Sequence, residues 1–143
     1  MELRDVVNSN SRLRGCWKQG ARAVESTHKK HLRARSCKGS IAIDACLKHQ
    51  CPQDARWDYG LDVGKHAVFI EIHPASSGEV KRVLAKLKWL KSYCTAHCSG
   101  FSRLPKTFHW VASGTVAIRK GSRYAKQLAQ HGLHGPVSYL DLG

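Results

Sequence analysis

Residues 56–74, RWDYGLDVGKHAVFIEIHP, decide the fold of this chain. Both flanks of the segment are rich in β-branched and aromatic residues, and Gly64-Lys65 between them suits a two-residue loop with glycine first. The segment therefore predicts a β-hairpin in which Val63 pairs with His66. The pairing of all other residues in the hairpin follows by counting outward from this pair.

This register places two carboxylates, Asp58 and Glu71, directly opposite each other on one face of the hairpin. The two-residue period of a strand adds Asp62 and His73 to that face, and turns mostly Val68, Ile70 and Ile72 to the other. Facing carboxylates repel unless a cation lies between them, and oxygen ligands at this separation suit Mg²⁺ or Mn²⁺. A solvated acidic face neutralised by Lys and Arg is the alternative. The acidic pair together with His73, in a very basic chain, favours the metal site.

Asp58, followed by Glu71-Ile72-His73 at the end of the next strand, resembles the motif of the PD-(D/E)xK nuclease superfamily. The resemblance implies that Asp58 and Glu71 hold the metal ion, with the backbone carbonyl of Ile72 as a third ligand. His73 stands where the superfamily has Lys, and Trp57 where it often has Pro. The imidazole of His73, largely neutral at its reference pKa, could position or deprotonate the attacking water. It could equally mark a chain that kept the fold and lost the chemistry.

The N-terminal third shows helical spacing of apolar residues from about Asn10 to Leu32, after a polar lead-in over residues 1–9. Gly39 is a plausible stop signal for this helix. Members of the superfamily often carry an acidic residue on their first helix, and Glu25 matches that role by position. An ion pair between Glu25 and Lys29, one turn further on, is the alternative.

The middle of the chain alternates strand and helix patterns. Residues 40–47 predict a half-buried strand, whose Asp44 could reach the same site, and residues 48–55 predict a loop. Pro74 is expected to end the second hairpin strand. Ser76 and Glu79 have the spacing of a capping box, which predicts a helix from Val80 onward. Its buried stripe is Val80, Val83, Leu84, Leu87, Leu90 and Tyr93, and its exposed side carries Lys81, Lys86, Lys88 and Lys91.

Towards the C-terminus, residues 107–112 and 115–118 predict either a hairpin or one bulged strand. A short helix over 123–131 and an edge strand over 137–140 follow. The predicted fold class is therefore α/β, with a central mixed sheet that contains a β-hairpin and is flanked by helices. The αβββαβ order of these elements resembles the restriction-endonuclease-like core of the same superfamily. Residues 1–143 are expected to form one such nuclease-like domain.

The charge balance predicts a polyanionic partner. Lys and Arg number 24 and Asp and Glu number 10, for a net charge of +14. Nucleic acid, with DNA preferred, is the first expectation and an anionic membrane surface the second. No stretch is long and apolar enough to cross a bilayer, and the first residues contain no signal-peptide pattern, which favours a cytoplasmic location. The expected backbone-binding residues are Arg22, Lys29, Arg56, Lys86, Lys88, Arg119 and Lys120.

Six cysteines leave several interpretations open. Without a signal peptide, free thiols are the expected state. A structural Zn²⁺ site would use Cys94 and Cys98, with Cys46 and Cys51 as further ligands. Because Cys94 and Cys98 fall one helical turn apart, core packing explains them equally well.

The sequence thus favours a Mg²⁺- or Mn²⁺-dependent nuclease acting on nucleic acid, with DNA as the expected substrate and catalytic residues Asp58, Glu71 and His73. Glu25 and Asp62 are further acidic candidates. A homodimer would allow two subunits to cut both strands. The alternatives are a catalytically inactive, nuclease-like nucleic-acid-binding module, or a protein-interaction module that uses its basic face against an acidic partner.

Overall fold

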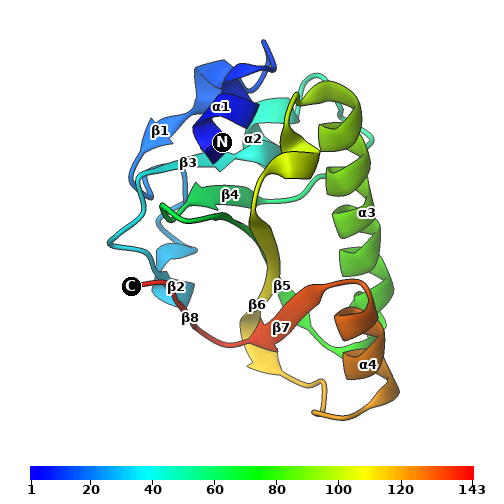
Figure 1. Ribbon diagram of the computed structural model, residues 1–143. Helices are drawn as coiled ribbons and strands as arrows, with labels where there is room; N and C mark the ends of the chain where they lie inside the picture. Colours follow the sequence, from blue (N-terminus) through cyan, green and yellow to red (C-terminus); the bar gives the residue numbers. More distant parts are fainter.

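The computed structural model describes residues 1–143 and centres on one six-stranded mixed sheet (Figure 1). Its strands lie in the order β1, β3, β4, β5, β6, β7. The pairs β1–β3, β3–β4 and β4–β5 are antiparallel, whereas β5–β6 and β6–β7 are parallel. The bounds are β1 Lys18–Gln19, β3 Gly39–Ala42, β4 Tyr59–Asp62, β5 Ala67–Ala75, β6 Lys106–Val116 and β7 Leu133–Val137. The predicted α/β class with a mixed central sheet is confirmed.

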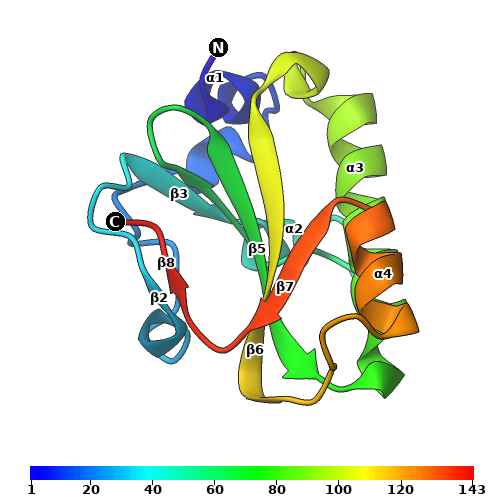
Figure 2. The same cartoon turned by 60° about the horizontal axis from the view of Figure 1, so that its bottom comes forward.

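Two helices join the parallel strands and lie side by side on one face of the sheet (Figures 1 and 2). α3 (Val80–His97) connects β5 to β6, and α4 (Arg123–Gln130) connects β6 to β7. Two shorter helices lie near the antiparallel strands: α1 (Leu3–Asn8) contacts β4, and α2 (Ile43–Leu47) contacts β3 and β4. Single 3₁₀ turns occur at η1 (Arg14–Cys16), η2 (Lys29–His31), η3 (Ser77–Glu79) and η4 (Phe101–Arg103). A separate parallel pair is formed by β2 (Leu32–Arg33) and β8 (Leu140–Asp141).

The sheet has an apolar core on each face, because β5 is buried on both sides. Phe69 points into the larger core beneath α1 and α3. The buried stripe of α3 matches the predicted one, except that Leu84 is only half-buried. Val68, Ile70 and Ile72 point into the smaller core, which Val24 and Leu32 cover. Glu71 lies on the same side of β5 as Phe69, so its carboxylate faces the layer of α3.

The β-hairpin has the predicted register. Tyr59 pairs with Ile70, and the Val63 N–H donates to the His66 carbonyl over 3.1 Å. Gly64 adopts a φ of +96°, which explains why glycine begins the loop. Asp58 and Glu71 are therefore the next opposed positions beyond the last paired residues of β4.

The helix predicted over residues 10–32 is wrong. This segment consists of turns and 3₁₀ helices around the short strand β1, while the only N-terminal α-helix, α1, lies in the expected lead-in. The chain reverses at Gly20, where φ is +55°, so that β1 can pair with β3. Tertiary contacts hold the irregular backbone: the Ala23 N–H, for example, donates to the Ser40 hydroxyl over 3.0 Å.

Two expectations around the hairpin also change. The strand predicted to Leu47 ends at Ala42, because the N–H groups of Ile43 and Asp44 donate to the Asp58 carbonyl (2.8 and 3.4 Å) and the chain turns into α2. β5 continues through Pro74 to Ala75, with a register shift at that point that accommodates the missing N–H.

The remaining differences lie in helix caps and C-terminal strands. The predicted capping box is absent: Ser76 makes no side-chain capping bond, and the Glu79 carboxylate is engaged by His73. Residues 106–116 form one irregular strand, β6, rather than a hairpin. α4 begins at Arg123, as predicted, and its N-cap is Ser122, whose hydroxyl accepts from the Ala125 N–H. In place of the edge strand predicted over residues 137–140, β7 pairs with β6 from Leu133 to Val137, and β8 (Leu140–Asp141) pairs with β2.

Gly39 is needed for packing in β3 rather than for ending a helix. A Cβ atom at this buried position would lie 2.0 Å from Cζ2 of Trp17. Gly39→Ala should therefore lower the free energy of unfolding by about 1–3 kcal/mol, because the Trp17 ring must move out of its place. Urea denaturation measures the loss. Gly114→Ala is the matched strand control, since nothing lies within 4 Å of its Cβ position. Equal losses in the two variants would contradict this account.

Candidate functional site

Asp58 and Glu71 form a reciprocal pair where β4 and β5 part. The Asp58 N–H donates to Oε1 of Glu71, and the Ile72 N–H donates to Oδ2 of Asp58, both over 3.0 Å. The two side chains thus replace backbone ladder bonds at the open end of the hairpin. Glu71 is completely buried, at 0% exposure. The opposition of these two carboxylates, predicted from the hairpin register, is present in the structure.

Lys86 supplies the cation nearest to this pair. Its Nζ lies 2.5 Å from Oε2 of Glu71, and its side chain is only 21% exposed. The helical pattern had placed Lys86 on the exposed side of α3, and that prediction is wrong. Its place beside Val83, Leu87 and Leu90 at the margin of the apolar stripe is the signal that could have indicated an inward ammonium group. A charge-assisted bond of this kind stabilises the ionised form of Glu71.

His73 lies between two carboxylates. Its Nδ1 is 3.6 Å from Oε2 of Glu71, and its Nε2 is 2.9 Å from Oε2 of Glu79. The nearby Glu71 carboxylate, and then the hydrogen bond with Glu79, raise the pKa of His73 despite partial burial. The same contact with His73 lowers the pKa of Glu79. The surroundings thus favour a charged imidazolium, where the sequence alone predicted a largely neutral ring able to act as a base.

Asp58 also lines a pocket of about 390 Å³, which Glu71, His73 and Lys86 do not line. Burial, and then the charge of Glu71, raise the pKa of Asp58 to about 7. Glu25 and Asp44 line the same pocket, so three carboxylates from distant parts of the sequence meet there. The full lining is Lys18, Ala23, Glu25, His28, Ala42, Asp44, Ala45, Asp58 and Tyr59.

Of the two additional acidic candidates, Glu25 lies at the pocket of Asp58 and Asp62 does not. Glu25 lies in an irregular segment rather than on a helix, and it makes no ion pair with Lys29. Asp62 lies four residues further along β4, about 13 Å from Asp58 at the usual strand rise. Its Oδ1 accepts from the Gly64 N–H over 2.8 Å, which stabilises the hairpin loop.

The pocket contains polar groups that the sequence did not reveal. Nδ1 of His28 lies 2.7 Å from the Tyr59 hydroxyl, and the Glu25 N–H donates to that hydroxyl over 3.3 Å. Burial is the main cause that raises the pKa of Tyr59 to about 12. Lys18 and His28 lie in the segment whose apolar spacing wrongly predicted a helix, so the sequence pattern did not connect them with Asp58.

The oxygen donors of this region fit a small hard cation. No group of three or more His, Cys, Asp or Glu side chains is close enough together to hold a metal ion by itself. Mg²⁺, however, usually takes only one or two protein carboxylates and completes its shell with water and substrate phosphate. Asp58 meets this requirement, because one oxygen is fixed by Ile72 and the residue also lines an acidic pocket.

The predicted nucleic-acid-binding residues fall into two groups. Arg56 and Lys86 are engaged internally: Arg56 pairs with Asp44 over 2.9 Å, and Lys86 pairs with Glu71. The other five are exposed and belong to no ion pair of the structure. They are Arg22, Lys29, Lys88, Arg119 and Lys120.

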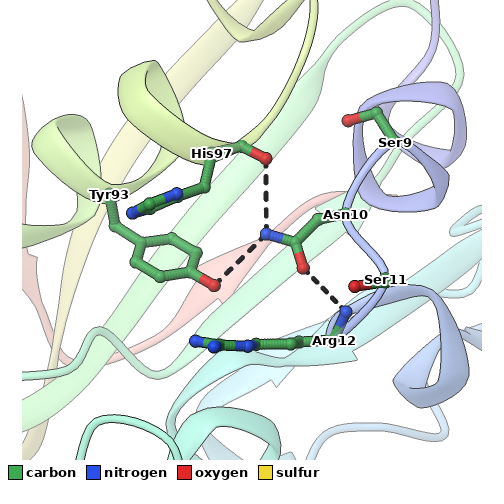
Figure 3. Close-up of a pocket in the computed structure, with 6 residues that line it drawn as sticks. All are labelled: Ser9, Asn10, Ser11, Arg12, Tyr93 and His97. Carbon is green, nitrogen blue, oxygen red and sulfur yellow. Dashed lines mark hydrogen bonds between the residues drawn. The ribbon is translucent and has the colours of Figure 1, made fainter.

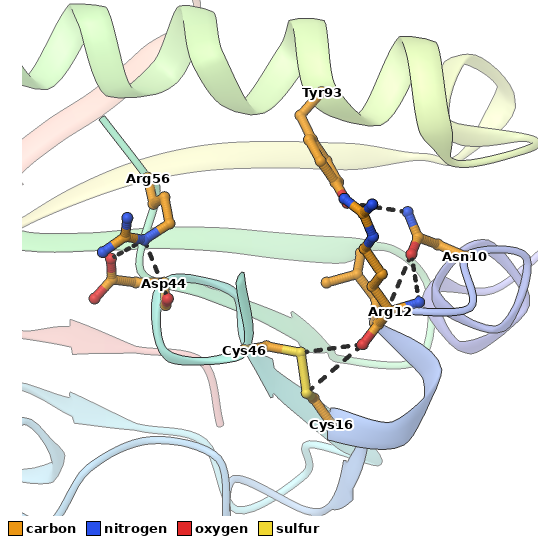
Figure 4. The surroundings of a disulfide bond; sticks show 8 residues. Asn10, Arg12, Cys16, Asp44, Cys46, Arg56 and Tyr93 are labelled. Atoms are coloured by element: carbon orange, nitrogen blue, oxygen red, sulfur yellow. Dashed lines mark hydrogen bonds and ion pairs between the residues drawn. A yellow bond between two sulfur atoms is a disulfide. The ribbon is translucent and has the colours of Figure 1, made fainter. Parts of the chain in front are cut away.

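One disulfide joins Cys16 to Cys46, which corrects the expectation that all thiols are free (Figure 4). It links η1 to α2, and hence the segment after α1 to the helix that carries Asp44. Cys94 and Cys98 are buried in the larger core, and the hydrogen bond between them raises the pKa of Cys94 and lowers that of Cys98. Core packing thus accounts for this pair without a metal.

Comparisons with known proteins leave the site to be judged on its own geometry. No protein-family model matches the chain, and no curated protein or solved structure shows significant similarity to it. None of the helices has both the length and the apolar character that crossing a membrane requires.

The contact between Lys86 and Glu71 should contribute strongly to stability. Lys86→Met would leave a fully buried carboxylate without its nearest cation, at a cost of about 3 kcal/mol. Adding Glu71→Gln should recover part of the loss, because a neutral amide can still accept from the Asp58 N–H. Urea denaturation of the single and double variants measures both effects. Lys88→Met, on the exposed side of α3, is the control, and equal stability of the two lysine variants would refute the prediction.

Proposed function

We propose that this chain is a metal-dependent nuclease with a restriction-endonuclease-like core, acting on nucleic acid and most naturally on DNA. The observation that carries the proposal is the Asp58–Glu71 pair, fixed by reciprocal backbone bonds and neutralised from α3 by Lys86. When β1, β2 and the short helix α2 are left aside, the order α1, β3, β4, β5, α3, β6 is that of the αβββαβ core of that class. The net charge of +14 suits a polyanionic substrate.

Asp58 and Glu71 would hold Mg²⁺ or Mn²⁺, with the Ile72 carbonyl as a further ligand. Such a metal ion lowers the pKa of a bound water and offsets charge on the scissile phosphate. Asp58 is suited to this role because burial, and then the nearby Glu71 carboxylate, raise its pKa to about 7, and a bound cation would favour its ionised form. Glu25 and Asp44 line the same pocket and could orient water around the ion.

The basic side chains of the site have separate roles in this proposal. Lys86 is the persistent cation that the superfamily motif would have at residue 73, brought in from α3 instead. His73 acts as a second positive group that orients Glu71, and not as the base that removes a proton from water. Deprotonation of the water then depends on the metal ion and on the carboxylates of the pocket.

Asp58→Asn should lower the rate of cleavage by roughly 100-fold or more, because the amide can no longer offer a charged ligand. The measurement incubates the protein with plasmid, linear duplex, single-stranded DNA and RNA, each with Mg²⁺, Mn²⁺ or EDTA. Binding in EDTA should change little, because phosphate contacts come from basic residues elsewhere. Asp141→Asn, at an exposed carboxylate near the C-terminus, should cut like the natural chain.

Absence of metal-stimulated cleavage by the natural chain on all four substrates would overturn the nuclease proposal. Salt-sensitive binding in that case would favour the second candidate, an inactive nucleic-acid-binding module. The observation that favours this candidate is that Lys86 and His73 already neutralise Glu71 without a metal ion. Cleavage that Asp58→Asn leaves intact would instead assign the chemistry to other residues.

A further inference from the structure

A second pocket, of about 310 Å³, lies near the C-terminal end of α3 (Figure 3). Its volume is at the lower end of the range of small-molecule sites, which begins near 300 Å³. Two segments supply its walls: the residues that follow α1, and the last turns of α3. The lining contains no carboxylate, and consists of Ser9, Asn10, Ser11, Arg12, Tyr93 and His97.

Asn10 holds the two segments of this pocket together and is only 7% exposed. Its Nδ2 donates to the Tyr93 hydroxyl (3.2 Å) and to the His97 carbonyl (3.3 Å). Its Oδ1 accepts from the backbone N–H groups of Arg12 (2.8 Å) and Leu13 (3.2 Å). Both ends of the buried amide are therefore used within the protein, and they hold the Arg12 backbone and the Tyr93 hydroxyl in place before any ligand arrives.

The guanidinium group of Arg12 is free to bind an anion. It takes part in none of the ion pairs of the structure, unlike Arg56, which is held by Asp44. Figure 3 shows it extending towards the Tyr93 hydroxyl, and its charge acts to lower the pKa of Tyr93 against the effect of burial. The Ser11 hydroxyl and the His97 imidazole add further donors at the same pocket.

We propose that this pocket binds a phosphoryl group. Arg12 would grip two of its oxygens with the planar fork of the guanidinium, which matches phosphate geometry. Ser11, Tyr93 and His97 would donate to the remaining oxygens from the other walls. No carboxylate in the lining competes for Arg12 or repels the ligand.

The phosphoryl group most consistent with this setting is that of a nucleic-acid strand, an assignment that rests on the proposed function. Lys86 on α3 contacts the carboxylate pair, and Tyr93 and His97 lie seven and eleven residues further along the same helix. At the helical rise this is about 10–16 Å. A strand running along α3 could therefore lie at the carboxylates and place another phosphate in the pocket.

Titration with inorganic phosphate at constant ionic strength tests the pocket by itself. In amide NMR spectra of the whole chain, the signals of Ser11 and Arg12 should shift and saturate. Arg12→Gln should weaken this binding at least tenfold, whereas Arg14→Gln, which removes an exposed arginine two residues away, should not. Absence of saturable shifts, or equal weakening by the two variants, would overturn the proposal.

Single strands with a 5′-phosphate or a 5′-hydroxyl, bound in EDTA and followed by fluorescence anisotropy, identify the source of the phosphoryl group. A tenfold preference for the phosphorylated end that Arg12→Gln abolishes would assign a terminal phosphate. Equal affinities that both fall tenfold in Arg12→Gln would assign an internal phosphodiester. Strand binding that Arg12→Gln leaves unchanged would overturn the nucleic-acid assignment. Because these measurements exclude cleavage, a failure of the nuclease proposal would be seen separately, in the cutting assay.

Discussion

The buried carboxylate of Glu71 is the constraint on which the site depends. Removing an ionised carboxylate from water costs several kcal/mol unless charged partners and hydrogen bonds replace the solvent. Three groups replace the solvent around Glu71: the N–H of Asp58, just before β4, the ammonium of Lys86 on α3, and the imidazole of His73 on β5. The position of α3 against the hairpin is therefore fixed by charge as well as by its apolar stripe.

The irregular N-terminal segment contributes side chains to both pockets. It contributes Lys18, Glu25 and His28 to the acidic pocket, and residues 9–12 to the pocket at the end of α3. The disulfide between Cys16 and Cys46 joins this segment to α2 between the two, as Figure 4 shows. A regular helix over the same residues could not have reached both places, since its side chains would follow one straight axis.

The two proposals place opposite charges in separate pockets. The first would place a metal ion at Asp58, in the pocket that Glu25 and Asp44 also line, whereas the second would place a phosphate beside Arg12 and His97, in a pocket without carboxylates. A phosphodiester strand needs both kinds of contact, because its scissile phosphate requires a cation and its other phosphates require basic side chains. α3 contacts the carboxylate pair through Lys86 and lines the phosphate pocket through Tyr93 and His97, which gives the proposed strand a common support.

Local periodicity determined the β-hairpin, its register and the long helix, because alternating and helical patterns act over a few residues. That register alone was enough to oppose Asp58 and Glu71. Tertiary structure decided the rest: it drew residues 10–32 into turns across the sheet, brought Lys86 inward to Glu71, and redirected Glu79 from a helix cap to His73. The physical reason is that a buried charge takes its partners from whichever elements pack against it, and no pattern along the chain records that choice.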